Sequence, residues 1–369
     1  MNPIRIGKTE VDLPALVLSL ALGAAGGMLA IWLHLPLGML LGSMVAVAAA
    51  AIFDIRPLGV GVGVPAPLRF FFVPIIGVSI GGAFTPEILR EAMHWVPSLL
   101  ALLLYLPLAL GTGYFVYHRI GGVPKVTAFF GAVPGGLIET VTLGEAAGAE
   151  PRMLTLLQFL RLILCILFVP IGFTWMTGHA VGSAAGVQLT GASVPIEATD
   201  AAVLFIAAVG GWWLGSRLRF PAAIMTGPIL MSAAAHLAGL TETVPPAWAI
   251  LLTQLVVGTS LGTRFAGLPH RTLWLALRLA VIASIACLAL AALFALLLAG
   301  LVNEPVTAVF LAYAPGGIAE MTLVALSLQI SVVYITAHHL ARIILSVVIA
   351  QALSRRIRTG SDEARRQGR

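Results

Sequence analysis

One eight-residue stretch decides how this chain is interpreted, because it occurs twice. Residues 132–139 read AVPGGLIE and residues 313–320 read YAPGGIAE, which places Pro315 181 positions after Pro134. Proline removes a backbone N–H and glycine frees the backbone, so Pro-Gly-Gly interrupts a helix. The repeat therefore predicts two broken helices, each with a glutamate shortly after the break.

The same spacing continues far beyond the motif. It relates Arg161 to Arg342 and Gln158 to His339, and a spacing of 185 residues relates Gly42 to Gly227. Matches in the same order over most of each half indicate an internal duplication. We expect a first membrane repeat at 1–175, an extracytoplasmic linker at 176–200, a second membrane repeat at 201–353 and a basic cytoplasmic tail at 354–369.

The composition excludes a soluble protein. Of the 369 residues, 59% are hydrophobic and 10% are charged, and the mean hydropathy is +1.02. A soluble domain carries about 25% charged residues. Cys165 and Cys287 lie in apolar runs and are expected to be small core residues. The predicted fold class is an all-α polytopic membrane protein, multi-pass in a bacterial plasma (inner) membrane.

The distribution of basic residues favours one topology. Each half has five apolar segments and one broken segment. The broken segment is 124–148 in the first half and 305–329 in the second half. If the broken segments are re-entrant, the halves are inverted, and most loop Lys and Arg residues lie in the cytoplasm with both termini. The linker 176–200, which has no Lys or Arg, then lies outside. We therefore expect about ten transmembrane helices plus two re-entrant segments, with full crossing of those segments as the alternative.

The broken segments carry the candidate site. Glu139 and Glu320 would lie at membrane depth, where an ionisable group indicates function, and are candidates for proton or cation coupling. Arg161 and Arg342 would pair with a motif glutamate or meet a substrate carboxylate. The alternatives are a kink with capping glutamates and structural ion pairs. The candidate substrate- or ion-binding residues are Pro134, Gly135, Gly136, Glu139, Gln158, Arg161, Pro315, Gly316, Gly317, Glu320, His339, Arg342, Ser79 and Ser260.

The last two residues lie in a second repeated pattern. Residues 77–81 (GVSIG) and 258–262 (GTSLG) match the G-x-S-x-G of hydrolases. Both lie in apolar segments, where small residues at four-residue spacing let helices pack closely. Packing is the favoured interpretation and ion contact the second. We expect no enzyme activity, cofactor or metal site, since the chain has no phosphate-binding loop, dinucleotide fingerprint or Cys-x-x-Cys.

The doubled Pro-Gly-Gly-x-x-Glu, with Gln158-x-x-Arg161 or His339-x-x-Arg342 after it, resembles the AbrB-duplication family of bacterial membrane proteins. The resemblance covers nearly the whole chain. The family is often labelled a transcriptional regulator or an ammonia monooxygenase. Neither label fits these residues, which contain no DNA-reading element and no histidine constellation for an oxygenase metal. The regulatory label implies at most an indirect influence on gene expression.

Two functional hypotheses follow. Inverted repeats with interrupted helices are typical of secondary transporters, here for a small solute, with an anion as one candidate. The alternative is a membrane-embedded sensor or regulator that moves nothing. The expected partners are the lipid bilayer and a small-molecule or ion substrate, without direct nucleic-acid binding. The sequence leaves open the substrate, its direction and whether a homo-oligomer forms.

Overall fold

The computed structural model describes residues 4–6, 9–35, 37–56, 59–65, 68–86, 91–135, 137–178, 196–220 and 222–367. Helices make up most of this part of the chain. A short antiparallel pair, β1 (Ile4–Ile6) and β2 (Thr9–Val11), precedes the first helix. Asp12 caps that helix by accepting a hydrogen bond from the Ala15 amide. The prediction of an all-α polytopic protein is confirmed.

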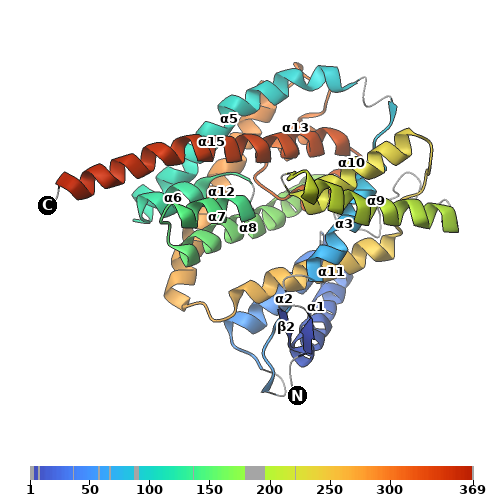
Figure 1. The fold of residues 1–369 in the computed structure, drawn as a ribbon, viewed down its shortest axis with the longest axis horizontal. Coiled ribbons are helices and arrows are strands. Elements are labelled where there is room, and N and C mark those ends of the chain that lie inside the picture. Colours follow the sequence, from blue (N-terminus) through green and yellow to red (C-terminus); the bar gives the residue numbers. More distant parts are fainter. Residues whose placement is uncertain are drawn as a thin grey trace. The chain divides into compact units, whose positions relative to one another are not determined.

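The helices of the two halves follow the same order (Figure 1). The first half contains α1 (Leu13–Trp32), α2 (Gly38–Ile52), α3 (Leu68–Gly81), η2 (Ala92–Trp95), α5 (Val96–Tyr114), η3 (Phe115–Ile120), α6 (Lys125–Ala132), α7 (Leu137–Ala146) and α8 (Pro151–Thr177). The second half contains α9 (Ala198–Arg217), α10 (Ala223–Leu237), α11 (Ala247–Gly262), η4 (Thr263–Phe265), α12 (His270–Leu297), α13 (Val306–Tyr313), α14 (Ile318–Ser327) and α15 (Val332–Gln367).

Four pairs of equivalent helices have the same length. Both α1 and α9 have 20 residues, and both α2 and α10 have 15. The two short helices before the breaks, α6 and α13, have 8 residues each, and the two after them, α7 and α14, have 10 each. This recurrence of helix lengths is what an internal duplication would produce.

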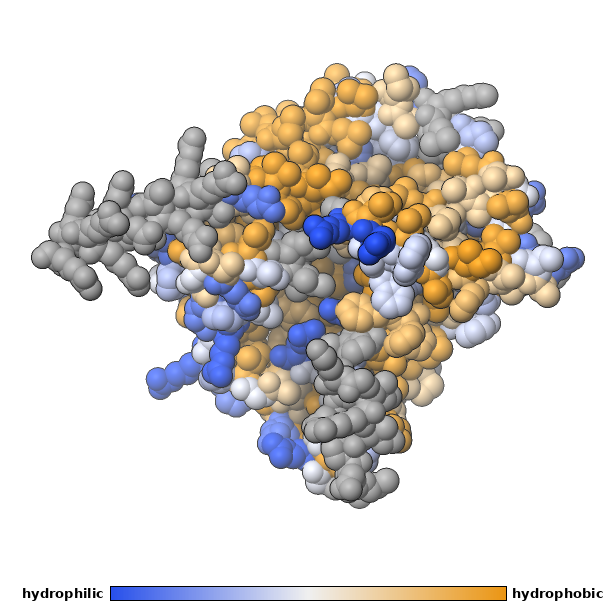
Figure 2. Space-filling model, viewed as in Figure 1, coloured by the Kyte–Doolittle hydropathy of each residue, from blue (hydrophilic) through white to orange (hydrophobic). Residues whose placement is uncertain are grey.

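Several helices are long and apolar enough to cross a membrane. Within the described residues there are six: Leu13–Trp32, Ala92–Ile120, Pro151–Met176, Ala198–Arg217, His270–Leu297 and Val332–Ala352. Large apolar side chains on them are exposed, including Val17 (61%), Phe205 (67%) and Leu296 (65%). Figure 2 shows apolar residues covering much of the visible face. Such a surface is suited to lipid and not to water.

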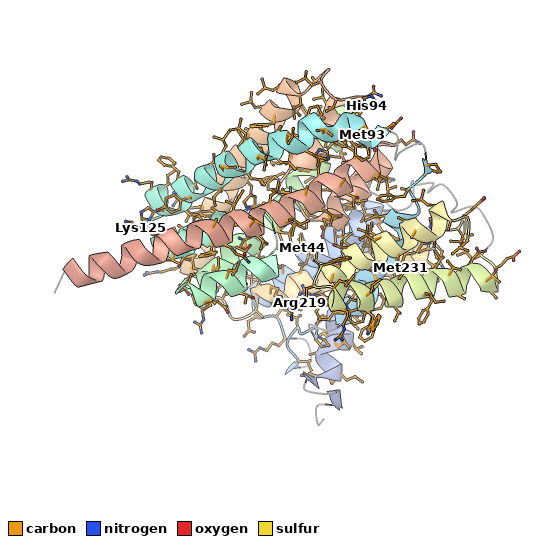
Figure 3. The ribbon with its side chains drawn as sticks, turned by 45° about the horizontal axis from the view of Figure 1, so that its top comes forward. Met44, Met93, His94, Lys125, Arg219 and Met231 are labelled. Carbon is orange, nitrogen blue, oxygen red and sulfur yellow. The ribbon has the colours of Figure 1, made fainter. Side chains whose placement is uncertain are left out.

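Two exposed basic side chains illustrate what lies at the helix ends. Figure 3 labels Lys125, the first residue of α6, and Arg219, which follows α9, and both are exposed. These positions are typical of residues at a membrane–water interface.

The helices form two compact units, and each unit combines helices of both halves. The first unit contains α1, α2, α3, α9, α10 and α11. The second contains α5, α6, α7, α12 and α13, with α8 as far as Ile166, α14 as far as Met321 and α15 from Tyr334. Both Pro-Gly-Gly breaks and the arginines that follow them therefore belong to the second unit.

Glycines hold the first unit together at equivalent places in the two halves. A Cβ on Gly42 of α2 would overlap the carbonyl oxygen of Gly26 on α1. In the same way, a Cβ on Gly227 of α10 would overlap the carbonyl oxygen of Gly211 on α9. Each pair of helices is thus packed backbone against backbone, as small residues allow in a membrane.

The G-x-S-x-G glycines join the halves to one another. A Cβ on Gly81 of α3 would lie 2.7 Å from the carbonyl oxygen of Ile229 on α10. A Cβ on Gly262 of α11 would lie 2.7 Å from the carbonyl oxygen of Met44 on α2. Ser79 donates to the Ile75 carbonyl of its own helix at 3.1 Å. These contacts favour the packing interpretation of the pattern.

Candidate functional site

Both helices break at the Pro-Gly-Gly motif. The residues that precede the prolines, Val133 (ψ 119°) and Ala314 (ψ 134°), leave the helical region. A following proline disfavours the helical conformation in this way. Gly135 has a φ of 144°, which side-chain-bearing residues rarely adopt. Each break therefore exposes the last carbonyl groups of α6 or α13, which have lost their helical partners.

Arg161 and Gln158, both on α8, satisfy the carbonyls at the first break. The Arg161 guanidinium donates to the carbonyl of Val133 at 2.8 Å and to that of Ala132 at 3.2 Å. Gln158 donates to the carbonyl of Phe130 at 2.6 Å and accepts from Arg161 at 2.8 Å. Both side chains are buried, with exposed fractions of 7% and 1%.

Arg342 and His339 of α15 do the same at the second break. Arg342 donates to the carbonyls of Ala314 and Gly316, the latter at 2.6 Å. His339 Nε2 lies 2.9 Å from the Leu311 carbonyl, and its Nδ1 lies 3.3 Å from Arg342 Nη2. The carbonyls of Leu311 and Ala314 are the equivalents of those of Phe130 and Val133 at the spacing of 181 residues.

This arrangement identifies what each arginine binds. A cation at a helix C-terminus is favoured by the helix dipole, and carbonyl oxygens replace part of its lost hydration. Among the described side chains, no carboxylate forms an ion pair with Arg161 or Arg342. The Nε atoms of both arginines are buried without a hydrogen-bond partner in this part of the chain. Backbone carbonyls are therefore the main described partners of both arginines.

The contacts of His339 fix its tautomer. A carbonyl only accepts hydrogen bonds and a guanidinium only donates them, so Nε2 carries the hydrogen and Nδ1 is the acceptor. In this form the imidazole presents one donor and one acceptor, as the amide of Gln158 does at the first break. The Gln158–His339 difference between the halves thus preserves the same hydrogen-bonding pattern.

Glu320 lies in the first turn of α14 and is buried, with an exposed fraction of 7%. Its carboxyl group accepts a hydrogen bond from its own backbone amide. A Cβ on Gly317 would overlap its Oε2, so the carboxyl occupies space that only glycine leaves free. The equivalent Gly136 and the side chain of Glu139 lie outside the described residues.

Each break also packs against the long helix of the other half. Ser346 of α15 donates to the carbonyl of Pro134 at 3.0 Å, and a Cβ on Gly135 would lie 3.5 Å from Ile343 Cα. A Cβ on Gly317 would lie 3.4 Å from Leu162 Cδ1 on α8. Leu162 and Ile343 are themselves equivalent. The second unit therefore brings both breaks against α8 and α15.

Sequence reasoning missed a buried polar cluster beside the second break. Tyr105 of α5 donates to the carbonyl of Tyr313 at 2.9 Å, and Tyr313 donates to the carbonyl of Ser98 at 2.5 Å. The hydroxyl of Ser98 lies 2.8 Å from Nε2 of His338. The first half has Ala132 and Leu157 in place of Tyr313 and His338. Polar residues in the second half at positions where the first half has apolar ones were the sequence feature that could have predicted this cluster.

Two of the predicted site residues are not in the unit that contains the breaks. Ser79 and Ser260 belong to the first compact unit. Within the described part of the chain, no group of three or more His, Cys, Asp or Glu side chains is placed to hold a metal ion.

The fold and site define a helical membrane protein with two broken helix pairs, in which buried arginines bind the broken ends. Residues 48–358 match the family described as "Transition state regulatory protein AbrB", and the chain belongs to this family. It is similar to "Putative regulator AbrB" of Escherichia coli (strain K12), with 28% identity over 348 residues, 93% of this chain and 95% of that protein. It is also similar to "Uncharacterized protein YhjN" of Bacillus subtilis (strain 168), with 25% identity over 352 residues, 89% of this chain and 90% of that protein.

Proposed function

We propose that this protein is a secondary transporter of a small solute in the bacterial inner membrane. The observation that carries the proposal is the pair of equivalent helix breaks in one unit, each with a buried arginine and a motif glutamate. Irregular backbone at membrane depth needs a protein-lined or water-filled surrounding, and transporters place their sites there. The repeats would be inverted, with both termini in the cytoplasm.

Within this proposal the charged residues have different roles. Arg161 and Arg342 keep the broken ends open by occupying the freed carbonyls. Their buried Nε atoms have no hydrogen-bond partner among the described residues and would donate to an anionic solute that enters the site. Glu139 and Glu320 couple transport to protons or cations. The protein carries out no chemical reaction and binds no nucleic acid directly.

The test is flux in proteoliposomes with a panel of small carboxylates and other anions. Glu139→Gln and Glu320→Gln should each abolish pH- or ion-coupled uptake while the purified protein keeps its helical circular dichroism. Glu242→Gln is the matched control, because Glu242 is exposed between α10 and α11. Coupled uptake that is normal in both motif variants would contradict the proposal.

A second candidate function follows from the family description, which is regulatory. A membrane sensor of this kind would send its signal through the short loops or the basic tail at 354–369. Truncation after Leu353 separates the two functions. A regulator would lose its output, whereas a transporter would retain flux.

A further inference from the structure

Glu320 is a buried carboxyl group with no described counter-charge. Its carboxyl group accepts a hydrogen bond from its own amide. It also occupies the space that Gly317 leaves free. The buried ionisable side chains described on α5, α8, α13 and α15 of this unit are Tyr105, Arg161, Cys165, Tyr313, Tyr334, His338, His339 and Arg342. None of these is hydrogen-bonded to the carboxyl among the described contacts.

The arginine that contacts this break is already hydrogen-bonded to backbone carbonyls. Arg342 donates to the carbonyl of Gly316, adjacent to Gly317, and to that of Ala314. His339 is neutral in the tautomer that its two partners require. An ionised Glu320 would therefore be a buried charge with no cationic partner among the described residues, stabilised only by its own amide and the N-terminal end of α14, and this is unfavourable.

The same contacts argue against a metal cation as the ligand of Glu320. A hard cation needs several oxygen ligands around it. The carbonyls of Ala314 and Gly316 are occupied by the guanidinium of Arg342, and the carbonyl of Gly317 accepts from the Met321 amide at 3.1 Å. A proton needs only the carboxyl itself.

We propose that Glu320 is a proton-binding site, neutral in this conformation, and that Gly317 creates the space in which the carboxylic acid lies. Binding takes one proton from water and converts the carboxylate to the acid. The claim that this proton is the coupling ion of transport rests on the proposed function. The claim that Glu320 binds a proton does not.

Dicyclohexylcarbodiimide tests the site without knowledge of the solute, because it attaches to protonated carboxyl groups in apolar surroundings. The full-length protein is labelled in detergent and the modified peptide is located by mass spectrometry. We expect modification at Glu320 that falls at least about tenfold between about pH 5 and about pH 9. Replacing Na⁺ by choline should not change it, and Glu320→Gln should remove it.

Gly317→Ala provides the second variant, because its added Cβ displaces the carboxyl without removing it. It should shift the pH of half-maximal labelling. Gly111→Ala is the control, since a Cβ there would meet nothing within 4 Å, and it should leave that pH unchanged.

Two results would overturn the proposal: Glu320 that stays unlabelled at every pH in folded protein, or Na⁺ that protects it from labelling. Labelling in a protein that transports nothing would contradict the proposed function and support the proton site. Flux with an unlabelled Glu320 would contradict the proton site alone.

Discussion

At the scale of single residues, the breaks show how backbone carbonyls accommodate a buried cation. Arg161 and Arg342 donate to carbonyls that lost their helical bonds, so two unfavourable groups satisfy each other. Gln158 and His339 complete each set by donating one further turn back along the broken helix. The sequence predicted buried arginines but not their partners, because backbone carbonyls are present at every residue and leave no mark in the sequence.

The repeat itself supplies a test of His339. His339→Gln should preserve stability, because Gln158 provides the same donor and acceptor at the first break. His339→Leu should lower the free energy of unfolding by about 1–3 kcal/mol, since the Leu311 carbonyl loses its donor. Thermal unfolding of the purified variants measures this. Equal losses in the two variants would mean that the ring, and not its hydrogen bonds, is what matters.

At the scale of helices, much of the organisation could be predicted from sequence. The broken segment expected at 124–148 is observed as α6 and α7, and the one at 305–329 as α13 and α14. Hydropathy and the Pro-Gly-Gly motif are local features of the sequence, and they were therefore sufficient to predict these elements. The packing of α3 against α10 and of α11 against α2 was not predicted. A glycine in a single sequence indicates close helix packing but not which helix it packs against.

Glycine contacts give a second prediction. Gly227→Ala should lower the free energy of unfolding by about 1–3 kcal/mol, because its Cβ would enter the backbone of α9. Gly210→Ala is the matched control on α9, where a Cβ would make an ordinary contact at 3.7 Å. Thermal stability in one detergent should separate the variants. A stable Gly227→Ala protein would show that α9 and α10 can move apart without cost.

At the scale of the whole molecule, the direction of the second repeat determines how the two breaks are used. Inverted repeats would open the breaks towards opposite sides of the membrane, whereas parallel repeats would open both towards one side. Helix lengths are the same in either case, so topology has to be measured. The linker 176–200 separates the two possibilities, because it lies outside only if the first half crosses an odd number of times.

A single cysteine at Ser183, a residue outside the described ranges, makes that measurement in a background without Cys165 and Cys287. We expect a membrane-impermeant thiol reagent to label Ser183→Cys in intact cells. Labelling only after the cells are opened would mean six crossings in the first half and parallel repeats.

The contacts between α3 and α10 and between α11 and α2 also concern the origin of the chain. Each of these contacts joins one half of the chain to the other half. An ancestor of half the length would therefore have needed a second copy of itself to form them. The present gene would then be a fused pair of subunits. Cut within the linker and co-expressed, the two pieces should assemble into one complex, while either piece alone should be degraded.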